Sequence, residues 1–295
     1  FEPVSLSLSE DKHSLFKDPE EEKIIEDGEF EMPDESKAYI TQPGDIWMLG
    51  NHRLMCGDCR ESKSVLTLMN GEKADLIVTD PPYNVAYQGD TEDKLTIEND
   101  SMANDDFLLF LRQVFSSMYR VTKEGAGIYV FHADSEGASF RIAFKQAGFK
   151  FAQCCIWRKN SLCLGRQDYQ WQHEPVLYGW KPGAPHNWYS DRKQTTVWDF
   201  DKPARNAIHP TMKPVALMAY PIQNSCREGG IVIDFFSGSG STIMACQQID
   251  RICYAMDVDP RYVDASVYRF KSLFKNVPIR LIRNGITMDA TLLLN

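Results

Sequence analysis

Short apolar runs alternate with amphipathic segments along most of the chain. The runs 74–79 (ADLIVT), 128–131 and 231–233 are brief and almost wholly apolar, as strands buried inside a parallel sheet are. Between them, residues 104–118 carry apolar side chains at helical spacing, and residues 140–147 repeat that pattern. This regular alternation predicts an α/β fold, with a mostly parallel sheet and helices on both of its faces.

Glycine and proline indicate where several elements begin and end. Gly50-Asn51 lies between two short apolar runs and predicts a tight hairpin. Pro260 precedes an amphipathic segment, and Pro214 likewise predicts the first turn of a helix. Pro221 has no N–H donor, so we expect it to kink or break that second helix before Cys226.

The alternation is lost over residues 158–213. This segment holds nine Lys or Arg against five Asp or Glu, together with four of the six tryptophans. Basic groups interleaved with aromatic rings suit phosphate contacts and base stacking, so the segment is a candidate nucleic-acid interface. A small β-rich insertion with an aromatic core would have the same composition.

The acidity of the chain is concentrated at its N-terminal end. The protein has 295 residues and a formal net charge of −9, yet residues 1–36 hold 13 acids against three lysines. Beyond them, acids and bases are nearly equal at 28 and 29. Residues 1–36 are therefore expected to form an acidic leader or linker, and the neutral remainder neither requires nor excludes DNA binding.

The remaining composition predicts a cytoplasmic protein without a membrane segment. No apolar run approaches the roughly 18 residues of a membrane helix, and the acidic leader has no signal-peptide pattern. Of the eight cysteines only Cys56 and Cys59 have ligand or redox spacing, and no second pair accompanies them. We expect reduced, structural cysteines and no metal.

The first candidate site follows the run 74–79. Asp80-Pro81-Pro82-Tyr83 places a carboxylate at the carboxyl end of a buried strand, where parallel sheets present functional residues. The two prolines lack N–H donors and have a fixed φ, so Asp80 and the Pro81 carbonyl form a rigid row of acceptors beside an aromatic ring. An ordinary turn after a strand would show the same residues.

A second candidate site follows the run 231–233. Asp234 ends this strand, and the loop around Gly238-Ser239-Gly240 leads into a helix, an arrangement that holds nucleotide cofactors. The next strand ends at Asp257, where an acid can accept hydrogen bonds from ribose hydroxyls. The third glycine of a dehydrogenase loop is missing, and Asp234 suits an amino group better than a pyrophosphate. Both facts favour S-adenosylmethionine over a dinucleotide.

Three motifs resemble those of amino-methylating DNA methyltransferases. They are Asp80-Pro-Pro-Tyr83, Asp234-Phe-Phe-Ser-Gly-Ser-Gly240 and His209-Pro-Thr-Met-Lys-Pro214, and their order resembles the β-permuted group. The resemblance covers about residues 45–274 and implies a Rossmann-like, S-adenosylmethionine-dependent methyltransferase fold. It also implies a division into an acidic leader (1–36), a catalytic half (37–157), a small inserted target-recognition region (158–213) and a cofactor-binding half (214–295).

The resemblance implies a role for each matching residue. Asp80 and the Pro81 carbonyl would accept the two N–H bonds of the target amine, Pro82 would complete the motif, and Tyr83 would stack on a flipped base. The predicted cofactor contacts are Asp234, Phe236, Gly238, Ser239, Gly240 and Lys213 at the methionine end, Asp257 at the ribose and Asp58 at the adenine. Asp80 favours adenine N6 over cytosine N4, because cytosine-specific relatives commonly have Ser there.

Double-stranded DNA is the expected substrate, and restriction–modification is the expected setting. The candidate strand contacts are Lys159, Arg166, Arg192, Lys193 and Arg205. The resemblance is compatible with a homodimer, and the leader resembles the tract that joins some such enzymes to an upstream ParB-like domain, which this chain lacks. The alternatives are N4-cytosine methylation, methylation of RNA or of a protein glutamine, a nicotinamide-dependent oxidoreductase, and a nucleic-acid-binding module with a vestigial cofactor site.

Overall fold

The computed structural model describes residues 24–25, 39–85, 101–201, 212–290 and 293–294. Apart from residues 24 and 25, the acidic leader lies outside the described residues, and so do Arg205 and the first half, residues 209–211, of the His209–Pro214 motif. Within the described ranges, no helix is long and apolar enough to cross a membrane.

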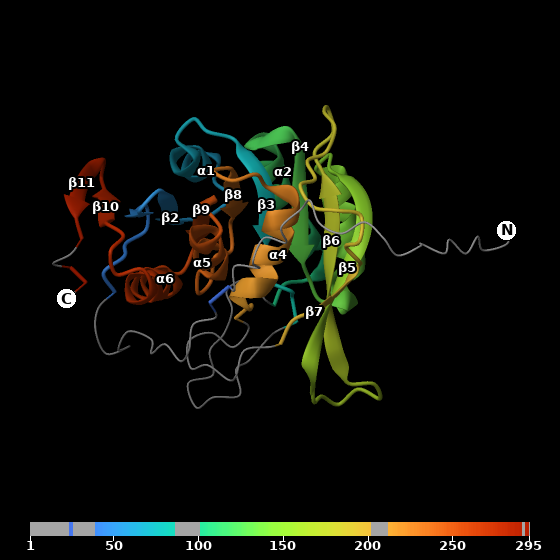
Figure 1. Ribbon diagram of the computed structural model, residues 1–295. Helices are drawn as coiled ribbons and strands as arrows, with labels where there is room; N and C mark the ends of the chain where they lie inside the picture. Colours follow the sequence, from blue (N-terminus) through green and yellow to red (C-terminus); the bar gives the residue numbers. More distant parts are fainter. Residues whose placement is uncertain (1–23, 26–38, 86–100, 202–211, 291–292, 295) are drawn as a thin grey trace, which may run out of the picture.

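Eleven strands of the described chain form one sheet (Figure 1). Across the sheet their order is β11-β10-β1-β2-β9-β8-β3-β4-β6-β5-β7. The five central strands, β2, β9, β8, β3 and β4, run parallel, and antiparallel pairs flank them on both sides. The predicted α/β fold with a mostly parallel central sheet is confirmed. The strands are β1 (Ile46–Leu49), β2 (His52–Cys56), β3 (Ala74–Thr79), β4 (Thr122–Phe131), β5 (Lys150–Cys163), β6 (Trp171–Trp180), β7 (Val197–Asp199), β8 (Ile231–Asp234), β9 (Ile252–Asp257), β10 (Ile279–Arg283) and β11 (Ile286–Asp289).

Helices cover both faces of this sheet (Figure 1). One face carries α1 (Ser62–Met69), α2 (Asn104–Arg120) and α3 (Gly137–Gln146), the last preceded by a 3-10 turn, η1 (Asp134–Glu136); the other face carries α4 (Val215–Ser225), α5 (Ser241–Gln248) and α6 (Pro260–Leu273). Local sequence explains α6 well, because Pro260 fits its first turn and the Asp259 side chain accepts a hydrogen bond from the Arg261 N–H. Its buried Val263 and Val267 then face the sheet.

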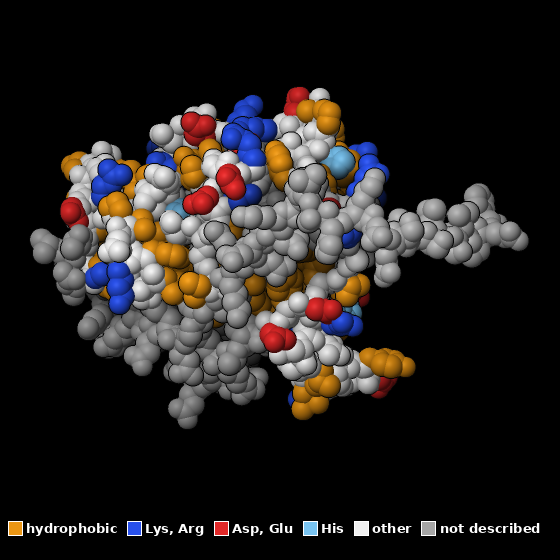
Figure 2. Space-filling model, viewed as in Figure 1, with side chains coloured by type: hydrophobic (Ala, Val, Ile, Leu, Met, Phe, Trp, Pro, Cys, Tyr) orange, Lys and Arg blue, Asp and Glu red, His pale blue; other side chains and the backbone are white. Residues whose placement is uncertain are grey.

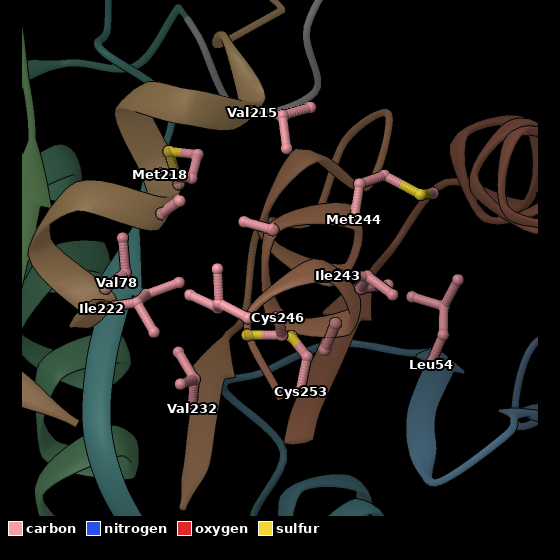
Figure 3. Packing of buried hydrophobic residues seen from close by; sticks show 14 of the residues in the cluster. Leu54, Val78, Val215, Met218, Ile222, Val232, Ile243, Met244, Cys246 and Cys253 are labelled. Atoms are coloured by element: carbon pink, nitrogen blue, oxygen red, sulfur yellow. The ribbon is translucent and has the colours of Figure 1, made fainter. Parts of the chain in front are cut away.

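Helix α4 continues through Pro221 to Ser225, so the expected break does not occur. Proline inside a helix costs about 3 kcal/mol. Against this, Leu217, Met218 and Ile222 are almost fully buried, and burial of each such side chain contributes about 1.5–3 kcal/mol. Met218 and Ile222 pack between α5 and β3, as Figure 3 shows. Tertiary packing therefore outweighs the local penalty.

Strand β6 lies within the segment that shows no regular pattern in the sequence. It is inserted between β4 and β5 and is antiparallel to both, so that Val176 pairs with Phe131 on one side and Cys155 on the other. Residues 175–179 are buried. The sequence pattern did not predict this strand, because its short apolar run is surrounded by aromatic and polar residues whose alternation is irregular.

Beyond the body of the sheet, β5 and β6 continue as a projecting hairpin, residues 158–173, which we call the β5–β6 arm (Figure 1). Arg158 pairs with His173 near its base and Cys163 pairs with Trp171 toward its end. Hydrophobic side chains gather on the arm in Figure 2. Leu164 and Tyr169 are 88% and 91% exposed, so these side chains make little contact with the rest of the described chain.

The eight cysteines are all free thiols in the structure. Cys56 and Cys59 are buried, and burial raises the pKa of the Cys56 thiol to about 12. Among the described residues, no cluster of His, Cys, Asp and Glu could hold a metal ion. Cys56 and Cys59 each belong to a buried apolar cluster of the core.

Candidate active site

Four of the predicted acids lie along one edge of the sheet. Asp80, Asp234 and Asp257 end or follow β3, β8 and β9, and Asp58 lies two residues beyond β2. These strands are parallel neighbours in the order β2-β9-β8-β3, so their carboxyl ends lie side by side. The Thr79 hydroxyl donates to Asp234 at 3.0 Å, which joins the two candidate sites. The fold thus brings the catalytic motif and the cofactor loop together.

Both carboxylate oxygens of Asp80 accept hydrogen bonds from within the chain. The Tyr83 hydroxyl donates to Oδ1 at 2.5 Å, and the Lys213 ammonium donates to Oδ2 at 2.6 Å. The Asp80 side chain is 19% exposed, and that of Lys213 only 5%. Asp80 is therefore an acceptor at a partly open position, already engaged by a buried cation and a hydroxyl.

A second carboxylate, Glu174 of β6, lies beside Asp80. Its Oε2 is 3.2 Å from the Lys213 ammonium and 3.0 Å from the Tyr83 hydroxyl, for whose single proton it is an alternative acceptor to Asp80. Its Oε1 pairs with the Lys159 ammonium at 2.6 Å. Two carboxylates and two ammonium groups thus form one compact cluster, in which the formal charges balance.

Burial and charge act in opposite directions on the two acids. Burial raises the pKa of Asp80, even though the Lys213 ammonium opposes this shift. Burial also acts to raise the pKa of Glu174, but the ammonium groups of Lys213 and Lys159 outweigh it and lower that pKa to about 2. Glu174 is therefore the firmly ionised member of the cluster.

Three aromatic rings surround the Lys213 ammonium. Its nitrogen lies 5.4 Å from the centroid of Tyr83, 5.5 Å from that of Phe131 and 6.0 Å from that of Trp157. These residues come from the loop after β3, from β4 and from β5. An acceptor surrounded by flat apolar faces can hold an amino group on an aromatic ring.

The loop between β8 and α5 has the backbone shape of a ligand-binding turn. Gly238 and Gly240 have φ of 49° and 80°, which glycine adopts without strain. A Cβ on Gly240 would lie 2.9 Å from Ser266 Oγ. The Gly238 N–H donates to Asp257 at 2.8 Å, and the buried Arg269 guanidinium donates to the Ser239 carbonyl at 2.8 Å. Asp257 at the end of β9 and Arg269 in α6 therefore fix the backbone of this loop.

Two carboxylates beside the loop, one buried (Asp234) and one partly buried (Asp257), accept hydrogen bonds from neutral donors. Asp234 accepts from the hydroxyls of Thr79 and Thr242 and from the Phe236 N–H, and Asp257 accepts from the N–H groups of Gly238 and Asp259. Burial raises the pKa of Asp234 to about 6 and that of Asp257 to about 7. A bound cation would stabilise both in their ionised forms.

The loop fits S-adenosylmethionine, which carries a sulfonium and an ammonium group. Ser237 Oγ is buried in the loop, and no partner for it is present among the described residues. An ionised carboxylate offers about four lone-pair sites, of which Asp234 uses three, so one acceptor site remains for an ammonium group. Three features of this loop suit a cationic nucleoside ligand. They are the Ser237 hydroxyl without a partner among the described residues, the remaining acceptor site of Asp234, and the positive φ of Gly238 and Gly240.

The predicted contacts occupy different environments in the structure. Lys213, expected at the cofactor, directs its ammonium to Asp80, while its carbonyl accepts from Ser241 Oγ at 2.7 Å. Lys159, expected on DNA, is buried and pairs with Glu174. Asp58 accepts hydrogen bonds from Arg60 through both carboxylate oxygens. The remaining predicted DNA contacts inside the described ranges, Arg166, Arg192 and Lys193, are exposed.

Sequence reasoning did not find Glu174 or Arg269. The only signal for Glu174 was an acid directly before a short apolar run, and acids at such positions are usually solvated. Arg269 lies on the buried side of the amphipathic helix α6, where a basic residue among apolar positions was the available signal.

Comparison with known proteins agrees with this site. A family model described as DNA methylase, for N6/N4 methyltransferases, matches residues 74–268. The type II methyltransferase M.HpaI of Haemophilus parainfluenzae is 27% identical over 249 residues, which cover 76% of each chain. The putative methylase YubD of Escherichia coli (strain K12) is 28% identical over 222 residues, or 75% of this chain and 91% of that protein.

Solved structures show the same fold. The M1.HpyAVI–SAM complex superposes with a TM-score of 0.56 at 21% identity and covers 73% of this chain and 98% of its own. The cytosine-N4-specific PvuII DNA methyltransferase superposes with a TM-score of 0.62 at 17% identity and covers 81% and 92%. The neighbours share a Rossmann-like methyltransferase fold, and the matched DNA methylase family uses S-adenosylmethionine. The chain belongs to the N6/N4 DNA methylase family.

Proposed function

We propose that this DNA methyltransferase acts on the N6 amino group of adenine in double-stranded DNA. The main support for this proposal is the position of Asp80. It follows β3, beside Asp234 and the cofactor loop, and its partner Lys213 lies among aromatic rings. An aspartate at this motif position favours adenine over cytosine N4, following the resemblance of the motif.

The residues support direct transfer to the amino nitrogen. An exocyclic amine is a poor nucleophile, because its lone pair is delocalised into the ring. Asp80 and the Pro81 carbonyl accept its two N–H bonds, which favours a pyramidal nitrogen with an available lone pair. S-adenosylmethionine supplies an electrophilic methyl group. Methyl transfer would leave the electron pair of the broken C–S bond on the departing sulfur, and Asp80, which holds one N–H of the amine, would accept the proton that the methylated nitrogen gives up.

The target base must leave the duplex to reach Asp80, and Tyr83 provides a stacking face for it. The side chains proposed to hold the DNA strand are the exposed Arg166 on the β5–β6 arm and Arg192 and Lys193 in the loop before β7. Lys159 contributes to this role only through the charge cluster, since its side chain is 8% exposed. The segment 158–213 is proposed to recognise the target.

On the cofactor side, we assign the methionine end to Asp234, Ser237 and the Gly238–Gly240 turn, and the ribose to Asp257. Ser237 enters this set because its buried hydroxyl has no partner among the residues that the structure places. Asp58 is proposed to contact the cofactor adenine from the end of β2, next to Asp257.

The variant Asp80→Ala tests this proposal. It is expected to bind S-adenosylmethionine with wild-type affinity by calorimetry and to lose methyl transfer to unmethylated plasmid DNA by at least a hundredfold, because the acceptor for the target amine is removed. Mass spectrometry of the nucleosides from the wild-type reaction identifies the modified atom. N4-methylcytosine as the product, or full transfer by the variant, would refute the assignment.

A further inference from the structure

The two donors that occupy Asp80 share one further acceptor. The Lys213 ammonium lies 2.6 Å from Asp80 Oδ2 and 3.2 Å from Glu174 Oε2. The Tyr83 hydroxyl lies 2.5 Å from Asp80 Oδ1 and 3.0 Å from the same Glu174 oxygen. Each donor could therefore turn from one carboxylate to the other with a small displacement.

In the proposed reaction Asp80 must accept hydrogen bonds from the target amine. An ammonium at 2.6 Å competes for the same oxygen, and it also repels the positive charge that develops on the amine nitrogen during transfer. A buried ammonium cannot be left without an anion, because an unpaired charge at a site that is 5% exposed is costly.

We propose that Glu174 is a positioning residue that takes over the Lys213 ammonium and the Tyr83 hydroxyl when the amino group of the target base binds Asp80. This inference rests on the proposed function, since it concerns how Asp80 becomes available. Glu174 acts through its neighbours and does not touch the reacting atoms.

The surroundings of the cluster suit such an exchange. The Lys213 main chain is fixed, because its carbonyl accepts a hydrogen bond from Ser241, so only the flexible side chain has to move. Glu174 stays in place because Lys159 binds its other oxygen at 2.6 Å. Both lysines remain neutralised before and after the exchange, and both oxygens of Asp80 become free to accept.

Glu174→Gln removes the second anion while keeping the shape of the side chain. Lys213 then has Asp80 as its remaining carboxylate partner, and we expect kcat at pH 7.5 to fall at least tenfold. The affinity for S-adenosylmethionine, measured by calorimetry, is expected to stay within twofold of wild type.

The pH profile separates this role from a structural one. Within the part of the chain that the structure describes, the charged and titratable groups that contact Lys213 are Asp80 and Tyr83 from the loop after β3 and Glu174 from β6, and Lys159 of β5 lies behind Glu174. Burial acts to lower the pKa of Lys213, but Asp80 and Glu174 outweigh it and raise that pKa in the wild type. Glu174→Gln removes one of these two anions, and the small fraction of Lys213 that has lost its proton, and so leaves Asp80 free, grows about tenfold per pH unit below the pKa. The ratio of wild-type to variant kcat is therefore expected to shrink between pH 7.5 and 9.5, by up to about tenfold per pH unit.

Two further variants complete the experiment. Asp75→Asn is the matched control, because it also converts a partly buried carboxylate to an amide and breaks an ion pair with a lysine, Lys123, at the start of β3 and away from the carboxyl ends of the strands. It is expected to keep the wild-type kcat and pH profile. Glu174→Asp retains the charge at a greater distance from Lys213, so an intermediate loss is expected, and this variant decides the question if Glu174→Gln does not fold.

Each outcome has one interpretation. Wild-type kcat in Glu174→Gln, or a loss of equal size at pH 7.5 and 9.5, overturns the positioning role while the wild-type enzyme still methylates DNA. If the wild-type enzyme does not methylate DNA, the proposed function fails, and the positioning role fails with it.

Discussion

At the scale of single residues, the active site consists of acids whose partners differ. Asp234 and Asp257 accept from neutral donors, which leaves them suited to a cationic cofactor. Asp80 and Glu174 instead share Lys213 and Tyr83. Under the proposed function, the carboxylates of this site therefore have three roles: Asp234 and Asp257 hold the cofactor, Asp80 accepts the target amine, and Glu174 positions a cation.

The ring and the hydroxyl of Tyr83 can be tested separately, because the ring is proposed to stack on the base and the hydroxyl lies within hydrogen-bond distance of Asp80 and Glu174. Tyr83→Ala removes the stacking face, and base–aromatic stacking contributes about 1–3 kcal/mol, so kcat/KM for DNA should fall roughly 5- to 150-fold. Tyr83→Phe keeps the ring but loses the hydrogen bonds to Asp80 and Glu174, and we expect a smaller loss.

Steady-state transfer of labelled methyl groups to DNA measures both Tyr83 variants. Cofactor binding, followed by calorimetry, serves as the control for folding. Equal losses in the two variants would show that the hydroxyl matters and the stacking face does not.

At the scale of elements, β6 links the site to the surface. Its buried half pairs with β4 and places Glu174 beside Asp80, and the same strand continues outward into the β5–β6 arm. The arm therefore begins at the active site and ends at exposed side chains such as Leu164 and Tyr169. DNA whose base enters the site would run close to this hairpin, and β-ribbons fit the major groove.

Tyr169→Ala tests the arm as a DNA contact. Because this side chain is 91% exposed, the free energy of unfolding is expected to change by less than about 0.5 kcal/mol. The affinity for duplex DNA, measured by fluorescence anisotropy at fixed salt, is expected to fall at least fivefold. The matched control is Ile286→Ala on β11, at the opposite end of the sheet and 66% exposed, which should leave DNA affinity unchanged. Equal affinities in all three proteins would exclude the arm tip from the interface.

At the scale of the whole molecule, folding holds two histidines neutral inside the protein. The Cys253 N–H donates to His52 Nδ1, so His52 carries its proton on Nε2 and donates it to Gln247. Burial lowers the pKa of His52 to about 4, and also lowers the pKa of His132 to about 4. Between about pH 6.5 and 4 the unfolded chain binds these protons and the folded chain does not, so each histidine lowers the stability as pH falls.

His52→Asn isolates one of these contributions. Asn can still accept from the Cys253 N–H but does not titrate. Asp234 and Asp257, with raised pKa values of about 6 and 7, act in the opposite direction, because they stabilise the fold as pH falls through the same range. The test is therefore a difference between proteins. From pH 7.5 to 5.0, His52→Asn should lose about 2 kcal/mol less unfolding free energy in urea titrations than wild type. An identical pH response would show that His52 titrates normally.

The sequence by itself determined the features that depend on near neighbours. The strands that end at Asp80, Asp234 and Asp257, the glycine turn and the helix that begins at Pro260 were all predictable, because apolar periodicity, glycine and proline act within a few residues. Parallel alternation then implied that these acids share one edge of the sheet.

The tertiary structure alone decided which distant groups meet. Glu174 lies 91 residues from Tyr83, and Lys213 lies 133 residues from Asp80, so no local pattern could pair them. Their contact depends on β6 entering the sheet antiparallel to β4, a register set by packing on both sides. The same packing carries α4 through Pro221 and buries Lys159, because burial in a cooperative core outweighs local preference.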